Sequence, residues 1–242
     1  GLCDLAVLIQ KKLAVTVPHF VPQKIVPWGY DLEQFQSRSE GIDEVRKKYN
    51  IPIAAKIIVY PGGLNSFTQP SIRDLCEAVI QINRQGINCI LVRTGPGPLT
   101  QIYPNDDYPK NIIRDLGVIP RDEISSILNI ADLFVQPGRI TPFEDLRLPS
   151  KIPEFLAIGK PVLLPNCHIA NLFQDGVDAI ILKTGEPQEI AQKCIDVFAD
   201  EKWSAALGKK GRMIAEQHFS IQRQTNLLVE AYQEAIRNFE SN

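Results

Sequence analysis

The feature that most constrains the fold is an alternation that begins at Ala55, where short apolar runs are followed by amphipathic segments. Most of these runs end at a glycine or proline turn, as in "KIIVYPG" (56–62) and "NCILVRTGPG" (88–97). Further strands are predicted in 111–120, 132–138, 161–165 and 178–185, and helices in 71–86, 121–131, 151–158, 186–200, 202–217 and 221–238. Short buried strands alternating with helices form a parallel sheet covered on both faces. The sequence therefore predicts an α/β fold with a doubly wound, Rossmann-type parallel sheet, in which ligands bind at the carboxyl ends of the strands.

The first 30 residues do not follow this alternation. "CDLAVLIQKKL" fits either a helix or a strand–helix pair, and "KIVPWGYDLEQF" begins with a short strand. The chain has 242 residues and no low-complexity linker, which favours one α/β domain with terminal additions. We therefore predict that residues 1–30 are a remnant of an inter-domain region and that residues 31–242 form one Rossmann-like domain, including the C-terminal helices.

Composition excludes several classes of protein. A net charge of −2 gives no electrostatic reason to expect nucleic acid or an anionic membrane as the main partner. No apolar run approaches the ~20 residues of a membrane-spanning helix. The N-terminus lacks a Met and the basic region of a signal peptide, so we expect a cytoplasmic fragment or processed product. The five cysteines and three histidines are scattered, which predicts reduced, buried thiols and no metal site.

The stretch "LPSKIPEFLAIGKPV" predicts a short helix with a carboxylate near its start. Ser150 is the expected N-cap, because its hydroxyl can accept a hydrogen bond from a free amide of the first turn. Gly159, followed by a proline, is expected to end the helix. Glu154 lies close to the helix start, where free amides attract anions. Its carboxylate is either a surface partner of Lys151 at i, i+3 or a group that meets a ligand.

Simple catalytic signatures are absent. The glycines of "RTGPGP" lack the third glycine of a dinucleotide-binding fingerprint, and the sequence contains neither a Walker A motif nor a G-x-S-x-G elbow. Two adjacent acids, Glu144 and Asp145 in "PFED", could share acid–base chemistry, but adjacent acids in a loop are more often solvated. The sequence therefore identifies no catalytic residue.

Four segments in fixed order carry a more specific signal. They are "IVPWGYDLEQF" (25–35), "LGVIPRDEISSILNIADLFVQPG" (116–138), "LRLPSKIPEFLAIGKPVLLP" (146–165) and "LFQDGVDAIILKTGEPQEIAQ" (172–192). Together they resemble the C-terminal, donor-binding domain of the family-four glycosyltransferases of GT-B fold. The first segment resembles the family's "V-P-N-G-V-D" turn, with Trp28 in the Asn place and Tyr30 in the Val place. The resemblance covers Lys24 to about Tyr232, most of the chain.

This resemblance implies the C-terminal half of a GT-B fold and a glycosyltransferase. Such a domain would bind a nucleotide-diphosphate sugar, with UDP-glucose as the first choice, for retaining transfer to an acceptor, and surface polysaccharide biosynthesis is the expected role. The family needs no metal or other cofactor for this reaction. The resemblance also implies that the acceptor-binding N-terminal domain is absent from this chain. We expect slow or no transfer by the chain alone, a place in the cytoplasm or at the inner face of the membrane, and peripheral membrane contact only through the missing domain.

The resemblance further assigns roles by position. The family's ribose-binding glutamate corresponds to Glu154, whose carboxylate would accept hydrogen bonds from two hydroxyls. The helix-start amides of Ser150 and Lys151 would hold the diphosphate. The remaining implied contacts are made by the backbone. Backbone groups of Val118, Ile119 and Pro120 would hold the base, and the backbone at Gly62 and Gly63 would come close to the phosphates and the sugar.

Two departures from the family pattern concern the sugar and the phosphates. Leu146 stands where the family carries a first glutamate that holds the donor sugar, and Asp145 or Glu144 could substitute for it. The family also has basic residues shortly after the first strand, whereas this chain has none before Arg73. We expect Arg147 and Lys151 to replace them, because these two cations flank the loop around Leu148 that would contact the donor. Arg93 is a weaker choice, which could equally pair with an acid beside its strand.

Two other functions stay open from the sequence. The missing first glutamate favours a non-catalytic nucleotide-sugar-binding module. A GT-B-like nucleotide-sugar epimerase half would need acids and a histidine in the cleft, and the three histidines lie outside the motif loops.

Overall fold

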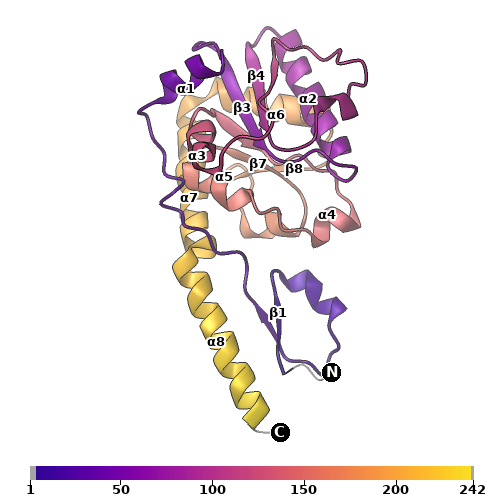
Figure 1. The fold of residues 1–242 in the computed structure, drawn as a ribbon, viewed down its shortest axis with the longest axis vertical. Helices are drawn as coiled ribbons and strands as arrows, with labels where there is room; N and C mark the ends of the chain where they lie inside the picture. Colours follow the sequence, from indigo (N-terminus) through magenta and orange to yellow (C-terminus); the bar gives the residue numbers. More distant parts are fainter. Residues whose placement is uncertain (1–3, 241–242) are drawn as a thin grey trace.

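The computed structural model describes residues 4–240, and its main body is the parallel α/β sheet that the sequence predicts (Figure 1). Six parallel strands lie in the order β5-β4-β3-β6-β7-β8. Their bounds are β3 Lys56–Pro61, β4 Cys89–Thr94, β5 Ile113–Asp115, β6 Leu133–Val135, β7 Val162–Pro165 and β8 Ile180–Leu182. The winding reverses between β3 and β6, which are neighbours in space but not along the chain. In a doubly wound sheet this reversal marks the binding crevice.

Helices cover both faces of the sheet, and each face has its own apolar core. On one face lie α2 (Gln69–Arg84) and α6 (Pro187–Ala199). On the other lie α1 (Ile42–Lys48), α3 (Arg121–Asn129), α5 (Ile152–Ile158) and the C-terminal part of α7 (Glu201–Phe219). The near-continuous apolar strands are buried on both sides, as such a sheet requires. The predicted burial of free thiols is confirmed for Cys76, Cys89, Cys167 and Cys194, whereas Cys3 lies outside the described residues.

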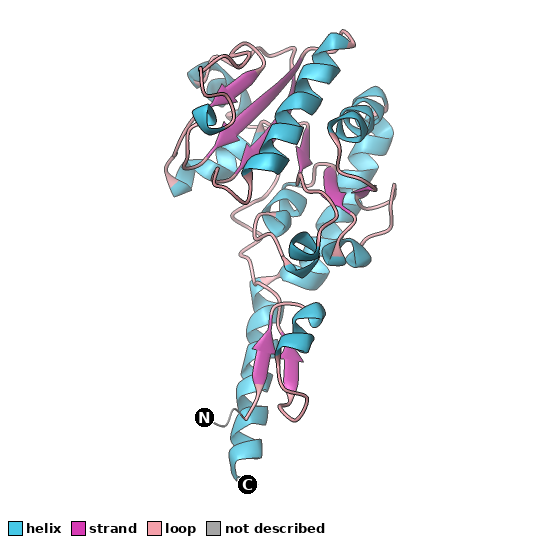
Figure 2. Cartoon of the chain, turned by 90° about the vertical axis from the view of Figure 1, so that its right-hand side faces the viewer, coloured by secondary structure: helices cyan, strands magenta, loops and turns pink. Residues whose placement is uncertain are grey.

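The N-terminal segment forms a separate small unit beside the last helix. Strands β1 (Ala6–Leu8) and β2 (Gln23–Ile25) pair in parallel and are linked through a 3₁₀ helix, η1 (Lys11–Thr16), so the strand–helix alternative is the right one. Figure 2 shows this two-stranded sheet lying along α8 (Ile221–Glu240), away from the main body. An ion pair between Lys24 and Glu230 (3.1 Å) joins the sheet to the helix. The assignment of residues 1–30 as an inter-domain remnant stays a prediction.

Tyr30 marks the junction between this unit and the main body. Its amide donates to the Phe219 carbonyl (2.8 Å) and its carbonyl accepts from the Ile221 amide (2.9 Å). Between those two residues Ser220 is extended, which separates α7 from α8. One connection is therefore a backbone clamp at a break between two helices, and a second is the ion pair of Lys12 in η1 with Asp145 of the main body.

Two local predictions are wrong. The acids of "PFED" are not in a loop, because residues Pro142–Leu146 form α4, with Thr141 as a side-chain cap that accepts from the Glu144 amide (3.1 Å). Ser150 is not the N-cap of α5. The cap position is Lys151, without a side-chain cap bond, and the Ser150 hydroxyl instead hydrogen-bonds the Tyr30 side chain. Gly159, with φ of 74°, ends α5 as predicted. The 3₁₀ helices η2 (Leu99–Gln101) and η3 (His168–Leu172) were not anticipated.

Candidate functional site

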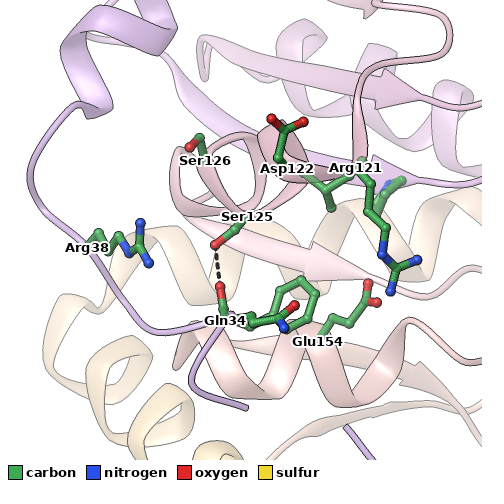
Figure 3. A pocket seen from close by; sticks show the side chains of 10 residues that line it. Gln34, Arg38, Arg121, Asp122, Ser125, Ser126 and Glu154 are labelled. Carbon is green, nitrogen blue, oxygen red and sulfur yellow. Dashed lines mark hydrogen bonds between the residues drawn. The ribbon is translucent and has the colours of Figure 1, made fainter. Parts of the chain in front are cut away.

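A pocket of about 420 Å³ lies beside the switch point, where β3 ends and α3 and α5 begin. Figure 3 shows Glu154 of α5 and Arg121 of α3 pointing toward one another in this pocket. The other lining residues come from the segment that precedes α1, from the end of β3 and from α3; they are Gln34, Phe35, Arg38, Pro61, Asp122, Ile124, Ser125 and Ser126. Three segments far apart in the sequence thus build one polar pocket around Glu154.

Glu154 is half-buried and its carboxylate accepts no hydrogen bond and forms no ion pair within residues 4–240. Burial raises its pKa to about 7, and the nearby charges of Arg121 and Lys151 oppose that rise. The alternative in which Glu154 is merely a surface partner of Lys151 is therefore wrong, since Lys151 contacts Tyr60 instead. A carboxylate with free acceptor capacity in a pocket can bind hydroxyl groups of a ligand.

Lys151 projects from the start of α5 over the end of β3. Its Nζ donates to the Tyr60 hydroxyl (3.0 Å) and lies 4.1 Å from the centre of the Tyr60 ring. A Cβ placed on Gly62 would lie 2.5 Å from this nitrogen, so the space that Gly62 leaves is occupied by the ammonium group. Gly63 instead faces the β4–η2 turn, where Pro96 is its nearest neighbour.

The predicted base-binding turn leads directly into Arg121, which lines the pocket. Val118, Ile119 and Pro120 connect β5 to α3, after Gly117 with φ of 63°. Arg121, the next residue, lines the Glu154 pocket, while Val118 lines a second pocket of about 430 Å³ beside the β4–η2 turn. Val118 thus lines the second pocket and Arg121 the first, while Ile119 and Pro120 line neither.

Arg93 is buried and already paired, so its guanidinium is not available to bind a phosphate. Its side chain is 1% exposed and pairs with both carboxylate oxygens of Asp115 (2.9 and 2.8 Å). The same guanidinium donates to the carbonyls of Pro96 (2.7 Å) and of Gly62 and Gly95 (3.3 Å each). Arg93 thus ties the glycine turns after β3 and β4 together, and its assignment to the phosphates is corrected to a structural role.

The residues around α4 are brought close to the site, but most already have partners. Arg147 pairs with Glu144 (3.2 Å) and stacks on Phe143. Glu144 is buried, and burial raises its pKa. Asp145 binds Lys12 and accepts from the His168 amide (2.9 Å), so its carboxylate is already engaged, and it does not line the Glu154 pocket.

Leu148 is buried in the apolar core, and Ser150 is exposed beside Tyr30. Neither side chain therefore lines the pocket around Glu154.

Of the ten residues that line the pocket, sequence reasoning assigned only Glu154. Arg121 carried a signal, because it opens a helix directly after the predicted base-binding turn. Gln34 and Arg38 carried none, since only the fold brings their segment to α3. Tyr30 was noted as a departure from the family pattern. Burial and the negative charge of Glu154 raise the pKa of Tyr30 to about 12.

Two absences concern the described part of the chain. Among residues 4–240, no three His, Cys, Asp or Glu side chains are grouped as a metal site would need. Within the same residues, every helix is too short or too polar to span a bilayer.

Comparison with known proteins decides the family. The family model described as "Glycosyl transferases group 1" matches residues 55–200, more than half of the chain. The chain belongs to this family. The matched range contains Glu154, Lys151 and the 118–121 turn, whereas Gln34, Phe35 and Arg38 of the pocket lie before it.

Similar proteins support the same fold. TuaC of Bacillus subtilis (strain 168), named as a teichuronic acid biosynthesis glycosyltransferase, is 23% identical over 210 residues, which are 86% of this chain and 50% of TuaC. HepE of Anabaena in complex with UDP superposes with a TM-score of 0.79 at 17% identity, covering 95% of this chain and 64% of HepE.

The C-terminal domain of LpcC from Francisella tularensis gives a TM-score of 0.64 at 17% identity, covering 80% of this chain and 100% of that domain. The fold is thus that of the Rossmann-like domains of GT-B glycosyltransferases. The chain spans half the length of TuaC and less than two-thirds of HepE.

Proposed function

We propose that this chain is the donor-binding, C-terminal half of a retaining GT-B glycosyltransferase and that it binds a UDP-sugar such as UDP-glucose. The observation that carries the proposal is Glu154, a half-buried carboxyl without an internal partner, which opens into a polar pocket at the switch point of a group 1 glycosyltransferase domain. Crystal structures of the similar protein HepE contain UDP or UDP-glucose, which favours the same donor class here.

In this proposal each part of the nucleotide meets one part of the site. Glu154 accepts hydrogen bonds from the ribose hydroxyls, and the backbone of Val118, Ile119 and Pro120 clamps the base beside Arg121. The diphosphate lies near Lys151. Because α5 has only seven residues, the ammonium group contributes more to this contact than the helix start does. No metal or cofactor takes part in binding.

The wider setting is also part of the proposal. A two-stranded parallel sheet is marginal alone, and parallel strands normally lie in larger covered sheets. The open β1–β2 sheet therefore supports an acceptor-binding N-terminal domain elsewhere in the protein, through which any peripheral membrane contact would be made. The name of TuaC favours a role in surface polysaccharide synthesis. We place the reaction in the cytoplasm, at the inner face of the membrane.

Calorimetry with UDP tests the proposal directly. Glu154→Ala removes two charge-assisted hydrogen bonds, so UDP affinity should fall on the order of 30- to 1000-fold, about 2–4 kcal/mol. Glu154→Gln should cost less, because the amide keeps one acceptor. Glu44→Ala, an exposed change on α1, is the control, and EDTA should leave wild-type binding intact. Unchanged UDP affinity in Glu154→Ala would contradict the assignment of Glu154 to the ribose hydroxyls.

A second candidate is a non-catalytic nucleotide-sugar-binding module. It is favoured by Leu146, which stands where the family has its first glutamate, and by Asp145, whose carboxylate is already engaged. The two proposals share the binding step and differ in turnover. Release of UDP from UDP-glucose by the full-length protein with its acceptor supports the transferase, whereas tight binding without release supports the module.

A further inference from the structure

The ammonium group of Lys151 is held at one point by an aromatic side chain. Tyr60 lies at the end of β3, and only 2% of its side chain is exposed. Its hydroxyl accepts a hydrogen bond from Lys151 Nζ (3.0 Å), and the ring centre lies 4.1 Å from the same nitrogen. A ring that is packed this tightly cannot follow a moving lysine. Tyr60 therefore fixes where the positive charge lies.

Gly62 provides the room for that charge. A Cβ at this position would lie 2.5 Å from Lys151 Nζ and 2.9 Å from Cε1 of Tyr60. Gly62 does not adopt a positive φ, so its backbone does not require glycine. What requires glycine here is the space that the buried Tyr60 ring and the ammonium group above it occupy.

The ammonium group also has donors to spare. Of its three N–H groups, Tyr60 takes one. Lys151 pairs with no carboxylate among residues 4–240, although its charge opposes the burial that raises the pKa of Glu144 and Glu154. A half-buried charge without a counter-ion is costly, and an anionic ligand offsets that cost. The turn after β3 supplies no other cation before Arg73.

We infer that Tyr60 and Gly62 position Lys151 as the principal cation for the diphosphate of the bound nucleotide. One lysine from the start of α5 thereby replaces the basic residues that the turn after β3 lacks. Tyr60 acts through the lysine and is a positioning residue, while Gly62 keeps the space open. The inference rests on the proposed function, because it assumes that a nucleoside diphosphate occupies the Glu154 pocket.

The test compares UDP with uridine, since only UDP carries the diphosphate. Calorimetry should show that Lys151→Ala weakens UDP on the order of 10- to 100-fold and leaves uridine unchanged. Tyr60→Phe, which keeps the ring, should weaken UDP about three- to tenfold, again without effect on uridine. Gly62→Ala should act in the same direction by displacing the ammonium group. Tyr49→Phe, which removes a hydroxyl bonded to Glu123, is the matched control and should change neither affinity.

A double-mutant cycle separates positioning from general damage to the fold. In the Lys151→Ala background, Tyr60→Phe and Gly62→Ala should have no further effect on UDP. If they still weaken UDP in that background, or if neither weakens it in the wild type, the positioning inference is wrong. Glu154 gives a separate readout. If Glu154→Ala loses uridine binding but Tyr60→Phe has no effect on UDP, only this inference is overturned. If the wild-type chain binds neither UDP nor uridine, the proposed function is overturned and the inference with it.

Discussion

Single residues at the carboxyl edge of the sheet differ in whether their charge is already satisfied. Arg93 and Asp115 satisfy one another inside the protein, and Arg147 is engaged by Glu144. Glu154 and Lys151 lie a few residues apart at the start of α5, yet each keeps unused hydrogen-bonding capacity. A ligand can use only the second kind of group without breaking an internal pair. The proposed nucleotide contacts therefore centre on Glu154 and Lys151.

The raised pKa of Glu154 predicts a pH-dependent affinity for uridine. The ribose hydroxyls bind the ionised carboxylate, and the free protein protonates Glu154 as the pH falls through about 7. Uridine affinity should thus be full above pH 8 and fall by up to about tenfold per pH unit below 7. Uridine is the better probe because it has no phosphate to titrate. Calorimetry from pH 5.5 to 8.5 measures the slope, and Glu154→Gln should abolish it; an equally steep slope in that variant would contradict the assignment.

Arg93→Ala should damage stability and not recognition. The change leaves the Asp115 carboxylate mostly buried without its partner and frees three carbonyls, which typically costs about 3–5 kcal/mol. Urea unfolding measures the loss, with the exposed Arg73→Ala as control. If stability is unchanged while the UDP-to-uridine affinity ratio falls, Arg93 binds phosphate after all.

The sequence identifies Glu154 as a site residue, but it does not show which arginines are already paired inside the protein. Glu154 follows from a local pattern, since the helix start and the Gly159 stop lie within one short stretch. The partner of Arg93 is 22 positions away on the neighbouring strand, and no local signal reports that pairing. Lys151 could be identified as a cation near the site, but its contact with Tyr60 depends on β3 and α5 meeting in the fold.

At the scale of elements, predictions succeed where a segment carries its own boundaries. The strands are continuous apolar runs with glycine or proline at their ends, and α2 ends where Gly86 takes φ of 85°, as predicted. The missed helix α4 also had a signal, because Thr141 and Glu144 have the spacing of a capping box. Its five residues were too few to show an apolar period, so the two acids dominated the interpretation.

The close contact between α5 and α7 gives an element-scale prediction. A Cβ on Gly208 of α7 would lie 2.1 Å from the Gly159 carbonyl oxygen at the end of α5, and backbone atoms cannot yield cheaply. Gly208→Ala should therefore destabilise the protein by about 2 kcal/mol or more, although alanine favours a helix. Denaturant unfolding measures this, with Lys210→Ala on the exposed side of α7 as control. A stabilised Gly208→Ala protein would show that the two helices are not packed this closely.

At the scale of the whole molecule, the Glu154 pocket shares no lining residue with the N-terminal unit. The residues that line the Glu154 pocket all lie between Gln34 and Glu154, on the main body. The β1–β2 sheet and α8 lie beyond the Tyr30 clamp (Figure 1). An exposed apolar row runs along α8, formed by Val229, Tyr232, Ile236 and Phe239. Sequence reasoning predicted these elements one by one but not this arrangement, because the clamp joins residues about 190 positions apart.

This separation predicts that the chain alone binds the donor nucleotide but transfers sugar poorly. Binding should survive because the residues that line the Glu154 pocket all lie in the main body, so UDP binding by this chain should depend on Glu154. Transfer requires an acceptor held against the sugar at a fixed distance and angle, and positioning of this kind accounts for a large part of catalysis. The chain spans half of TuaC, and under the proposed function the acceptor is held by an N-terminal domain and not by residues 4–240. Release of UDP from UDP-glucose in the presence of acceptor, measured for this chain and for the full-length protein, tests the expectation. Equal rates for the two would show that the groups needed for transfer lie within these 242 residues.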